Sequence, residues 1–393
     1  MSLTPLLQGF PDFNIHSTPL LILVVQGLIF VGLLFRRYVV KRNPSDLFLG
    51  MILLIVCYEQ ICYTVGFMGW YNVYRNTKIN YWLIPMSVAI APLIYFYVKS
   101  LTTSSFKFKK SDWWHFALAI GLVVYRTSIY TYDALQPGFD DTQNGYLKIH
   151  LDEAYVLTSL SFISFAQMII YLSFTFQLFF TYRKKINAFF SNTYKLELKW
   201  ILSFLIAFTL LFLYGAVQTF IGTMITDLSY TQQYWLNIFM AIVVLYVGIR
   251  GFFTDTTKLK KLDFSFTPQI ITVPEHEETS QVSEEEVTLV REYMESEHPY
   301  LDPELNLITL SRKLKLSRAK LSEIINHGFG KNFNDFVNSY RVDAVKKMLD
   351  DGKQEQLSLL VIAHECGFNS KATFNRVFKK LTQISPTEYL NTF

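Results

Sequence analysis

The sequence has few charged residues for its length. Of 393 residues, only 17% are Asp, Glu, Lys or Arg, whereas 51% are hydrophobic. Soluble domains average about a quarter charged residues, so this composition argues against an ordinary soluble protein and favours a membrane protein. The shortage is uneven, because charged residues are sparse before about residue 254 and dense after it. The chain therefore has two regions suited to different solvents.

Cysteine is also scarce. Cys57 and Cys62 fall in an apolar run and Cys366 lies in the charged region, so a framework of disulfides is not expected. Five residues apart on a helix, the first two point about 140° away from each other, which disfavours a shared metal. Basic residues are missing before the first apolar run and no small-residue cleavage pattern follows it, so we expect no cleavable signal peptide.

Catalytic signatures are missing as well. The sequence holds no glycine-rich phosphate loop, no metal-ligand spacing and no nucleophile elbow. Residues 317–320, Ser-Arg-Ala-Lys, match the serine–lysine pattern of β-lactamases, but the companion motifs of those enzymes are absent. We therefore expect neither an enzyme nor a bound metal or cofactor.

Long apolar runs dominate the first region. A membrane-spanning helix needs about 20 mostly apolar residues, and seven stretches qualify: 18–35, 46–68, 81–101, 113–132, 154–182, 200–226 and 234–253. The fourth is the weakest because Arg126 interrupts it, and the fifth is longer than a span requires. The sequence predicts an all-α protein in which residues 1–253 form a seven-helix transmembrane bundle embedded in a lipid bilayer.

Loop charges predict the orientation of this bundle. Lys and Arg cluster after the first, third, fifth and seventh runs, whereas the opposite loops hold Arg75, Lys78 and Lys148 among several acids. Because basic loops stay in the cytoplasm, the N-terminus should lie outside and the C-terminal region inside the cell (inner) membrane. All six tryptophans fall at the predicted ends of spans, where amphipathic rings prefer to sit.

Residues 254–283 differ in character from both regions. They contain Pro268, Pro274 and an acidic run through Glu278, and the helical periodicity disappears. This pattern predicts a flexible cytoplasmic linker with an r.m.s. reach of about 30 Å. A domain at 284–393 would then work close to the inner face of the membrane unless it is cut free.

The charged region carries two similar helix–turn–helix patterns. Leu310 and Leu314 indicate a short helix, "KLS" (315–317) a turn, and Leu321 begins a buried stripe on the next helix. After a long amphipathic run (333–348), "LSLLVIAHECGFNS" repeats the helix and turn, and "GFNSKATFNRVFKK" follows. In that stretch one side is apolar (Phe374, Val377, Phe378, Leu381), which leaves polar residues along the other. "SPTE" (385–388) predicts a capping box with proline in the first turn.

This region resembles the DNA-binding domain of the AraC/XylS family of bacterial transcription regulators over roughly residues 290–393. The second unit, "IAHECGFNSKATFNRVFKKLTQISPTEY", is similar to the family signature almost throughout. The first unit, "LSRKLKLSRAKLSEIINHGFGKNFNDFVNSYRV", is also similar but has Lys315 where the family usually has glycine. If that residue is left-handed, lysine costs up to about 1 kcal/mol relative to glycine. The resemblance implies two recognition helices that read consecutive major grooves of double-stranded DNA.

Position on these helices predicts which side chains face DNA. Arg376 is the strongest candidate, because arginine can contact guanine O6 and N7 together, and Asn375 suits adenine or phosphate. Lys320, Lys379 and Lys380 are better suited to phosphate, which gives affinity rather than sequence choice. The remaining predicted DNA-facing residues are Arg318, Ala319, Ser322 and Glu323 in the first unit, and Lys371, Ala372 and Thr373 in the second.

Two ionisable residues interrupt the predicted spans. Glu59 and Arg126 should lie at the same depth, about 20 Å above the cytoplasmic end of their helices. Because intramembrane charges normally find a partner, we expect an ion pair between them, with Gln218 as a third polar group, that locks the bundle or binds a polar signal. The alternative is that Arg126 reaches the outer interface and Glu59 forms a local hydrogen bond or is protonated.

The two regions together predict a membrane-embedded one-component transcription regulator. A small-molecule or protein signal would act on the bundle, and the C-terminal domain would bind promoter DNA, with RNA polymerase and a second copy of the chain as further partners. The family resemblance favours activation. The alternative is a transporter-like or anchoring bundle whose DNA-binding domain is released by proteolysis.

Overall fold

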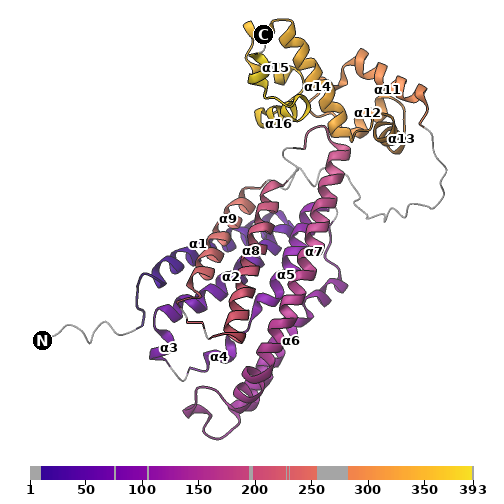
Figure 1. Cartoon of the computed structure of the whole chain (residues 1–393). Helices are drawn as coiled ribbons and strands as arrows, with labels where there is room; N and C mark the ends of the chain where they lie inside the picture. Colours follow the sequence, from indigo (N-terminus) through magenta and orange to yellow (C-terminus); the bar gives the residue numbers. More distant parts are fainter. Residues whose placement is uncertain are drawn as a thin grey trace, which may run out of the picture. The chain divides into compact units, whose positions relative to one another are not determined.

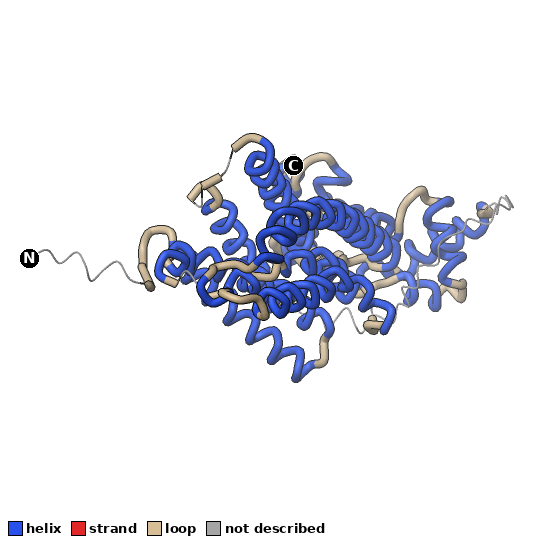
Figure 2. The backbone as a smooth tube through the Cα atoms, turned by 90° about the horizontal axis from the view of Figure 1, so that it is seen from below, coloured by secondary structure: helices blue, strands red, loops and turns tan. Residues whose placement is uncertain are grey.

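The computed structural model of the chain describes residues 10–74, 77–103, 106–193, 198–226, 228–229, 231–254 and 282–391. Within these ranges helices are the regular secondary structure, and loops connect them (Figure 2). The sole extended pairing in the described residues is an isolated antiparallel bridge between Phe190 and Asn306. The chain divides into two compact units, one made of residues 1–179 and 199–267 and the other of residues 180–198 and 268–393. The all-α class predicted from the sequence is confirmed.

The first unit is a bundle of apolar helices, drawn from indigo through magenta to salmon in Figure 1. Its main helices are α1 (Ser17–Lys41), α2 (Pro44–Phe67), α5 (Ile90–Thr102), α6 (Ala117–Ala134), the first part of α7 (Leu157–Phe189), α8 (Lys199–Met224) and α9 (Tyr234–Phe253). Shorter segments connect them: α3 (Trp70–Val73), α4 (Ile79–Trp82), η1 (Met86–Ala89), η2 (Lys110–Phe116), η3 (Phe139–Asp141) and the π-helix η4 (Lys148–Val156).

Helix α1 shows why the first unit packs as a bundle. Its buried positions are Leu20, Val24, Gly27, Val31 and Leu34, which alternate by four and three residues. That spacing keeps one narrow seam on the same side of the helix, as in left-handed helix bundles. The seam packs against α2 and α9, so a uniformly apolar helix still presents one defined face to its neighbours.

Six helices in the described part of the chain are long and apolar enough to cross a membrane: Ser17–Lys41, Pro44–Phe67, Ile79–Thr102, Lys148–Phe189, Lys199–Gly222 and Tyr234–Phe253. The sequence predicted seven, and the missing one is the fourth, at 113–132. There a 3-10 segment, Lys110–Phe116, precedes the 18 residues of α6. Arg126 and several hydroxyl side chains make α6 less apolar than its neighbours. The fifth span begins earlier than the predicted 154, because the helix starts at Lys148.

The second unit contains the C-terminal helices, drawn from orange to yellow in Figure 1. They are α11 (Glu284–Glu297), η5 (Pro299–Leu301), α12 (Leu307–Lys313), α13 (Arg318–Glu323), η6 (Ile324–Gly328), α14 (Phe333–Asp350), η7 (Lys353–Glu355), α15 (Leu359–Glu365), α16 (Lys371–Thr382) and α17 (Pro386–Leu390). Apart from its ends, the predicted linker 254–283 lies outside the described residues.

Two hydrophobic cores lie side by side along α14. The first core surrounds Leu310, Leu321 and Phe336, and the second surrounds Ile362 and Phe378. Helix α14 supplies residues to both, because its buried side chains run from its first turn to its last. Each core therefore stabilises one short-helix pair, and the long helix fixes the two pairs to each other.

Candidate nucleic-acid interface

The first helix–turn–helix unit consists of α12, a turn and α13. Asn306 caps α12 by accepting a hydrogen bond from the Thr309 amide at 3.0 Å, and Ser317 caps α13 by accepting from the Lys320 amide at 3.1 Å. Between them Lys315 has φ 56°. Lys315 is therefore left-handed, so lysine costs up to about 1 kcal/mol here relative to glycine.

The second unit repeats this arrangement with α15 and α16. Ser358 caps α15 and Ser370 caps α16, each through a hydroxyl that accepts a backbone N–H. Gly367 supplies the left-handed residue of the turn, with φ 86°. The capping box expected after this unit is confirmed as well, because Ser385 and Glu388 exchange hydrogen bonds at the start of α17.

Helix α16 presents a polar face opposite its apolar one. Phe374, Val377 and Phe378 are buried in the second core, whereas Leu381 is 38% exposed near the end of the helix. The exposed residues are Lys371, Ala372, Asn375, Arg376, Lys379 and Lys380. Lys371, Asn375 and Lys379 follow one another at four-residue intervals, so they form one row along the helix.

Thr373 does not belong to this exposed face. Only 5% of the residue is exposed, and its hydroxyl accepts a hydrogen bond from the Ser370 hydroxyl at 2.9 Å. The Thr373 amide also donates to Ser370 Oγ at 3.2 Å. The prediction that Thr373 faces DNA is therefore wrong. It lies at the third position of the helix, where the N-cap turns its side chain into the protein.

The first unit presents fewer exposed side chains on its recognition helix. Arg318 and Ala319 are exposed, whereas Ser322 and Glu323 are half-buried. Ser322 Oγ accepts a hydrogen bond from Asn326 Nδ2 at 3.3 Å. The predicted base-reading residues of α13 are thus smaller or more enclosed than those of α16.

Two of the predicted phosphate-binding lysines already hold carboxylates. Lys380 Nζ lies 2.6 Å from Asp335 Oδ1 on α14, and Lys320 Nζ lies 3.0 Å from Glu286 Oε2 on α11. The hydrogen bond to Lys320 lowers the pKa of Glu286, and the same bond raises the pKa of Lys320. Both groups are therefore charged at neutral pH, and either lysine must share or exchange its carboxylate to contact a phosphate.

Arg341 on α14 is a functional candidate that sequence reasoning missed. Only 1% of the residue is exposed. Its guanidinium donates to the Tyr300 carbonyl at 2.7 Å, the Asp302 carbonyl at 2.8 Å and the Ser191 hydroxyl at 3.1 Å. Burial lowers its pKa to about 10, so it stays charged at neutral pH. Arg341 follows Val337 by four residues, which places it on the buried face of α14. This spacing was the feature of the sequence that could have identified it.

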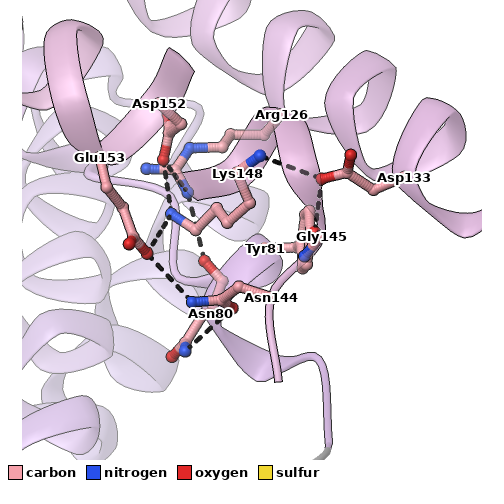
Figure 3. Close-up of polar contacts among 9 residues, drawn as sticks. All are labelled: Asn80, Tyr81, Arg126, Asp133, Asn144, Gly145, Lys148, Asp152 and Glu153. Carbon is pink, nitrogen blue, oxygen red and sulfur yellow. Dashed lines mark hydrogen bonds and ion pairs between the residues drawn. The ribbon is translucent and has the colours of Figure 1, made fainter. Parts of the chain in front are cut away.

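The structure of the first unit corrects the predicted pair of Glu59 and Arg126. Arg126 Nη1 lies 3.1 Å from Asp152 Oδ2 (Figure 3). Glu59 instead accepts a hydrogen bond from the Ser87 amide at 2.8 Å, which is the local bond of the alternative interpretation. Gln218 joins neither residue, because it donates to the Tyr214 hydroxyl and to the Gln232 carbonyl. The predicted pair is therefore wrong.

Asp152 belongs to a buried polar cluster of the first unit. Lys148 Nζ lies 2.5 Å from Asp152 Oδ2, and Asp133 accepts hydrogen bonds from the Tyr81 hydroxyl at 2.6 Å and the Lys148 amide at 3.0 Å. Arg126, Asp133, Lys148 and Asp152 are each no more than 3% exposed. This polar cluster (Tyr81, Arg126, Asp133, Lys148, Asp152) holds two cations and two carboxylates. Both cations contact Asp152, whereas Asp133 accepts from the Tyr81 hydroxyl and from backbone amides. Figure 3 shows the Arg126 and Lys148 side chains converging on Asp152.

Comparison with known proteins identifies the C-terminal domain. Residues 310–392 match the family described as helix-turn-helix domain, which is of the AraC type. An uncharacterized HTH-type transcriptional regulator of Haemophilus influenzae is 35% identical over 80 residues, or 20% of this chain and 26% of that protein. An uncharacterized HTH-type transcriptional regulator of Staphylococcus aureus is 30% identical over 114 residues, or 29% of this chain and 14% of that protein. The chain thus spans about a quarter or less of these relatives, and no solved structure matches it significantly.

Proposed function

Because residues 310–392 form an AraC-type helix-turn-helix domain, we propose that this chain is a membrane-embedded transcription regulator that binds promoter DNA. The observation that carries the proposal is the exposed polar row of α16, set opposite a buried apolar face in the second of two helix–turn–helix units. Such a helix fits the major groove, where each base pair presents a distinct pattern of hydrogen-bond donors and acceptors.

The residues of α16 divide into two roles. Arg376 reads guanine by donating to O6 and N7, and Asn375 reads an adjacent adenine or holds a phosphate. Lys371 and Lys379 contact the DNA backbone and supply affinity that depends on salt. On α13, Arg318 and Lys320 bind backbone phosphates, and the first unit adds less sequence preference because its recognition helix carries few long base-reading side chains.

The membrane part of the proposal needs α6 as a seventh pass. Its 18 residues rise about 27 Å at 1.5 Å per residue, close to the hydrocarbon thickness of about 30 Å. Arg126 would normally forbid this, but its charge is balanced by Asp152 inside the protein. Seven passes place every cluster of basic residues on one side, so that the C-terminal domain lies in the cytoplasm and the N-terminus outside.

Regulation in this proposal starts in the bundle. A small-molecule or protein signal acts on the membrane part and changes how the C-terminal domain binds promoters. The resemblance to the AraC/XylS family supports activation, with RNA polymerase as a partner and pairing of two chains on DNA.

Substitution of Arg376 tests the proposal. Arg376→Ala should cost about 1–3 kcal/mol on the cognate site and relax the base preference at one position. Lys379→Ala is the matched control, because it should weaken all sequences similarly and reduce the salt slope by about one. The measurement is binding of the purified full chain to cognate and random DNA at several salt concentrations. Equal affinity of the unsubstituted chain for both DNAs at physiological salt would rule out a specific regulator.

A further inference from the structure

The end of α7 and the residues after it belong to the C-terminal unit, although they lie more than 90 residues before α11, the next helix of that unit. The division between the two units falls inside this helix, between Phe179 and Phe180. We call residues 189–193, which end α7 and follow it, the strap. The strap is part of the same compact unit as the helix-turn-helix domain.

Backbone and side-chain hydrogen bonds hold the strap against the first helix–turn–helix unit. Phe190 forms an antiparallel bridge with Asn306, the N-cap of α12. The Ser191 amide and hydroxyl both donate to the Leu305 carbonyl, at 3.3 and 2.5 Å. From the other side Asn334 Nδ2, on α14, donates to the Phe190 carbonyl at 3.1 Å and the Ser191 carbonyl at 2.7 Å. The strap is therefore held on both sides.

Burial supports the same interpretation. Ser191 is 1% exposed and Thr193 is 2% exposed, and Phe189 packs against the first hydrophobic core. Small polar residues are seldom buried this fully unless their polar groups are satisfied. The strap thus completes the first core of the DNA-binding domain rather than lying on its surface.

Arg341 extends these contacts to the second unit. Its guanidinium donates to the Ser191 hydroxyl and to the Tyr300 carbonyl, and it lies 5.9 Å from the Phe368 ring centroid. Phe368 follows the left-handed Gly367 in the turn between α15 and α16. One buried cation therefore contacts the strap and the turn that precedes the second recognition helix.

We propose that the strap is a second attachment of the DNA-binding domain to α7, and the route by which α7 acts on that domain. The proposal rests on the proposed function, because it names how the membrane part regulates DNA binding. No residue separates the last residue of α7 from Phe190, so a shift of this helix end reaches the bridge with Asn306 directly. Arg341 then passes the shift from Ser191 toward the second unit.

Cleavage of the linker tests the attachment. A specific protease site is inserted between Thr267 and Pro268 of the full chain, membranes are isolated, and the site is cut. If the strap holds the domain, the C-terminal fragment should stay with washed membranes after complete cleavage. Release of the fragment from the unsubstituted chain at the first wash would overturn the proposal.

Two variants identify the strap as the cause of retention. Ser191→Trp cannot be accommodated at a site that is 1% exposed and leaves the C-terminal sequence unchanged, so it should release the fragment. Asn334→Ala removes two hydrogen bonds and should raise the released fraction about ten-fold, whereas Asn391→Ala, at an exposed position, should match the unsubstituted chain. If the C-terminal fragment of the Ser191→Trp variant stayed with the membranes, something other than the strap would hold it there, and the proposal would be refuted.

An insertion tests the route in the uncleaved chain. Two glycines between Ala188 and Phe189 should change reporter output from a bound promoter, and the same insertion between Thr267 and Pro268 should leave output unchanged. Equal outputs would refute the route. If the uncleaved, unsubstituted chain occupies no promoter, the proposed function fails, and the cleavage result still decides the attachment separately.

Discussion

At the scale of single residues, the two equivalent turns show what a left-handed position demands. Lys315 has φ 56° and Gly367 has φ 86°. The lysine is exposed, so the only free-energy cost at this position is that of the left-handed backbone conformation. At Gly367 a Cβ atom would come within 2.4 Å of the Tyr300 carbonyl and 2.9 Å of Arg341 Nε. Glycine is therefore required there by space as well as by conformation, because the buried arginine and its acceptor pass directly over the turn.

Replacement of Gly367 by alanine should destabilise the domain far more than replacement of Gly352. Gly352 also has a left-handed φ of 75°, but a Cβ there meets nothing within 4 Å, so alanine costs about 1 kcal/mol. At Gly367 the forced displacement of neighbours adds about 1–3 kcal/mol. Thermal unfolding of the purified full chain in detergent measures the difference. Equal losses in the two variants would contradict the steric explanation.

At the scale of elements, the polar cluster decides how α6 can lie among apolar helices. Arg126 is on α6, whereas Lys148 and Asp152 are on η4, which continues into α7. An unpaired buried charge costs several kcal/mol, so α6 depends on the carboxylate that η4 provides. The cluster thus joins α6 to η4. Without the opposite charges, the charged side chains of α6 and η4 could not be buried at these positions.

Loss of Asp152 should therefore be much more damaging than loss of its neighbour. Asp152→Ala leaves Arg126 and Lys148 buried without their shared partner and should cost about 3–5 kcal/mol. Glu153→Ala is the matched control, because that carboxylate lies 3.7 Å from Lys148 but is 42% exposed and should contribute at most about 1 kcal/mol. Thermal stability of the purified chain reports both. Similar stability of the two variants would show that the cluster does not hold α6.

At the scale of the whole molecule, the DNA-binding domain is assembled from segments far apart in the chain. Ser191 and Arg341 are in hydrogen-bond contact across 150 positions of sequence. A linker of the predicted kind would leave the domain attached at one point, whereas the strap gives it a second point next to α7. The two compact units are thus not consecutive along the chain.

Reporter fusions should reveal the seven-pass orientation. A reporter active only in the cytoplasm should give signal when fused after Thr254 and none when fused after Thr142, because the proposed seventh pass through α6 would put residues 133–147 outside. With α6 outside the membrane, the loop would instead lie on the same side as Lys107, Lys109 and Lys110. Signal from the Thr142 fusion would thus refute seven passes. Absence of signal from the Thr254 fusion would show that the C-terminal domain is outside the cytoplasm, where it could not bind DNA.

The sequence by itself was sufficient for the properties that depend on local pattern. Hydrophobic composition predicted the six long apolar helices, together with a seventh span at 113–132 that is not among them. Periodicity with turn residues predicted both helix–turn–helix units and the capping box at Ser385. These features arise within one or two helical turns, so neighbouring residues contain the necessary information.

Tertiary structure alone decided which distant groups meet. Arg126 selects Asp152 and not Glu59, Thr373 turns inward to its N-cap, and Arg341 contacts Ser191. Spacing limits which face a residue occupies but does not say which element packs against that face. The partner of a buried charge is chosen by the lowest cost of removing both groups from solvent, and that choice depends on the packing of the whole unit.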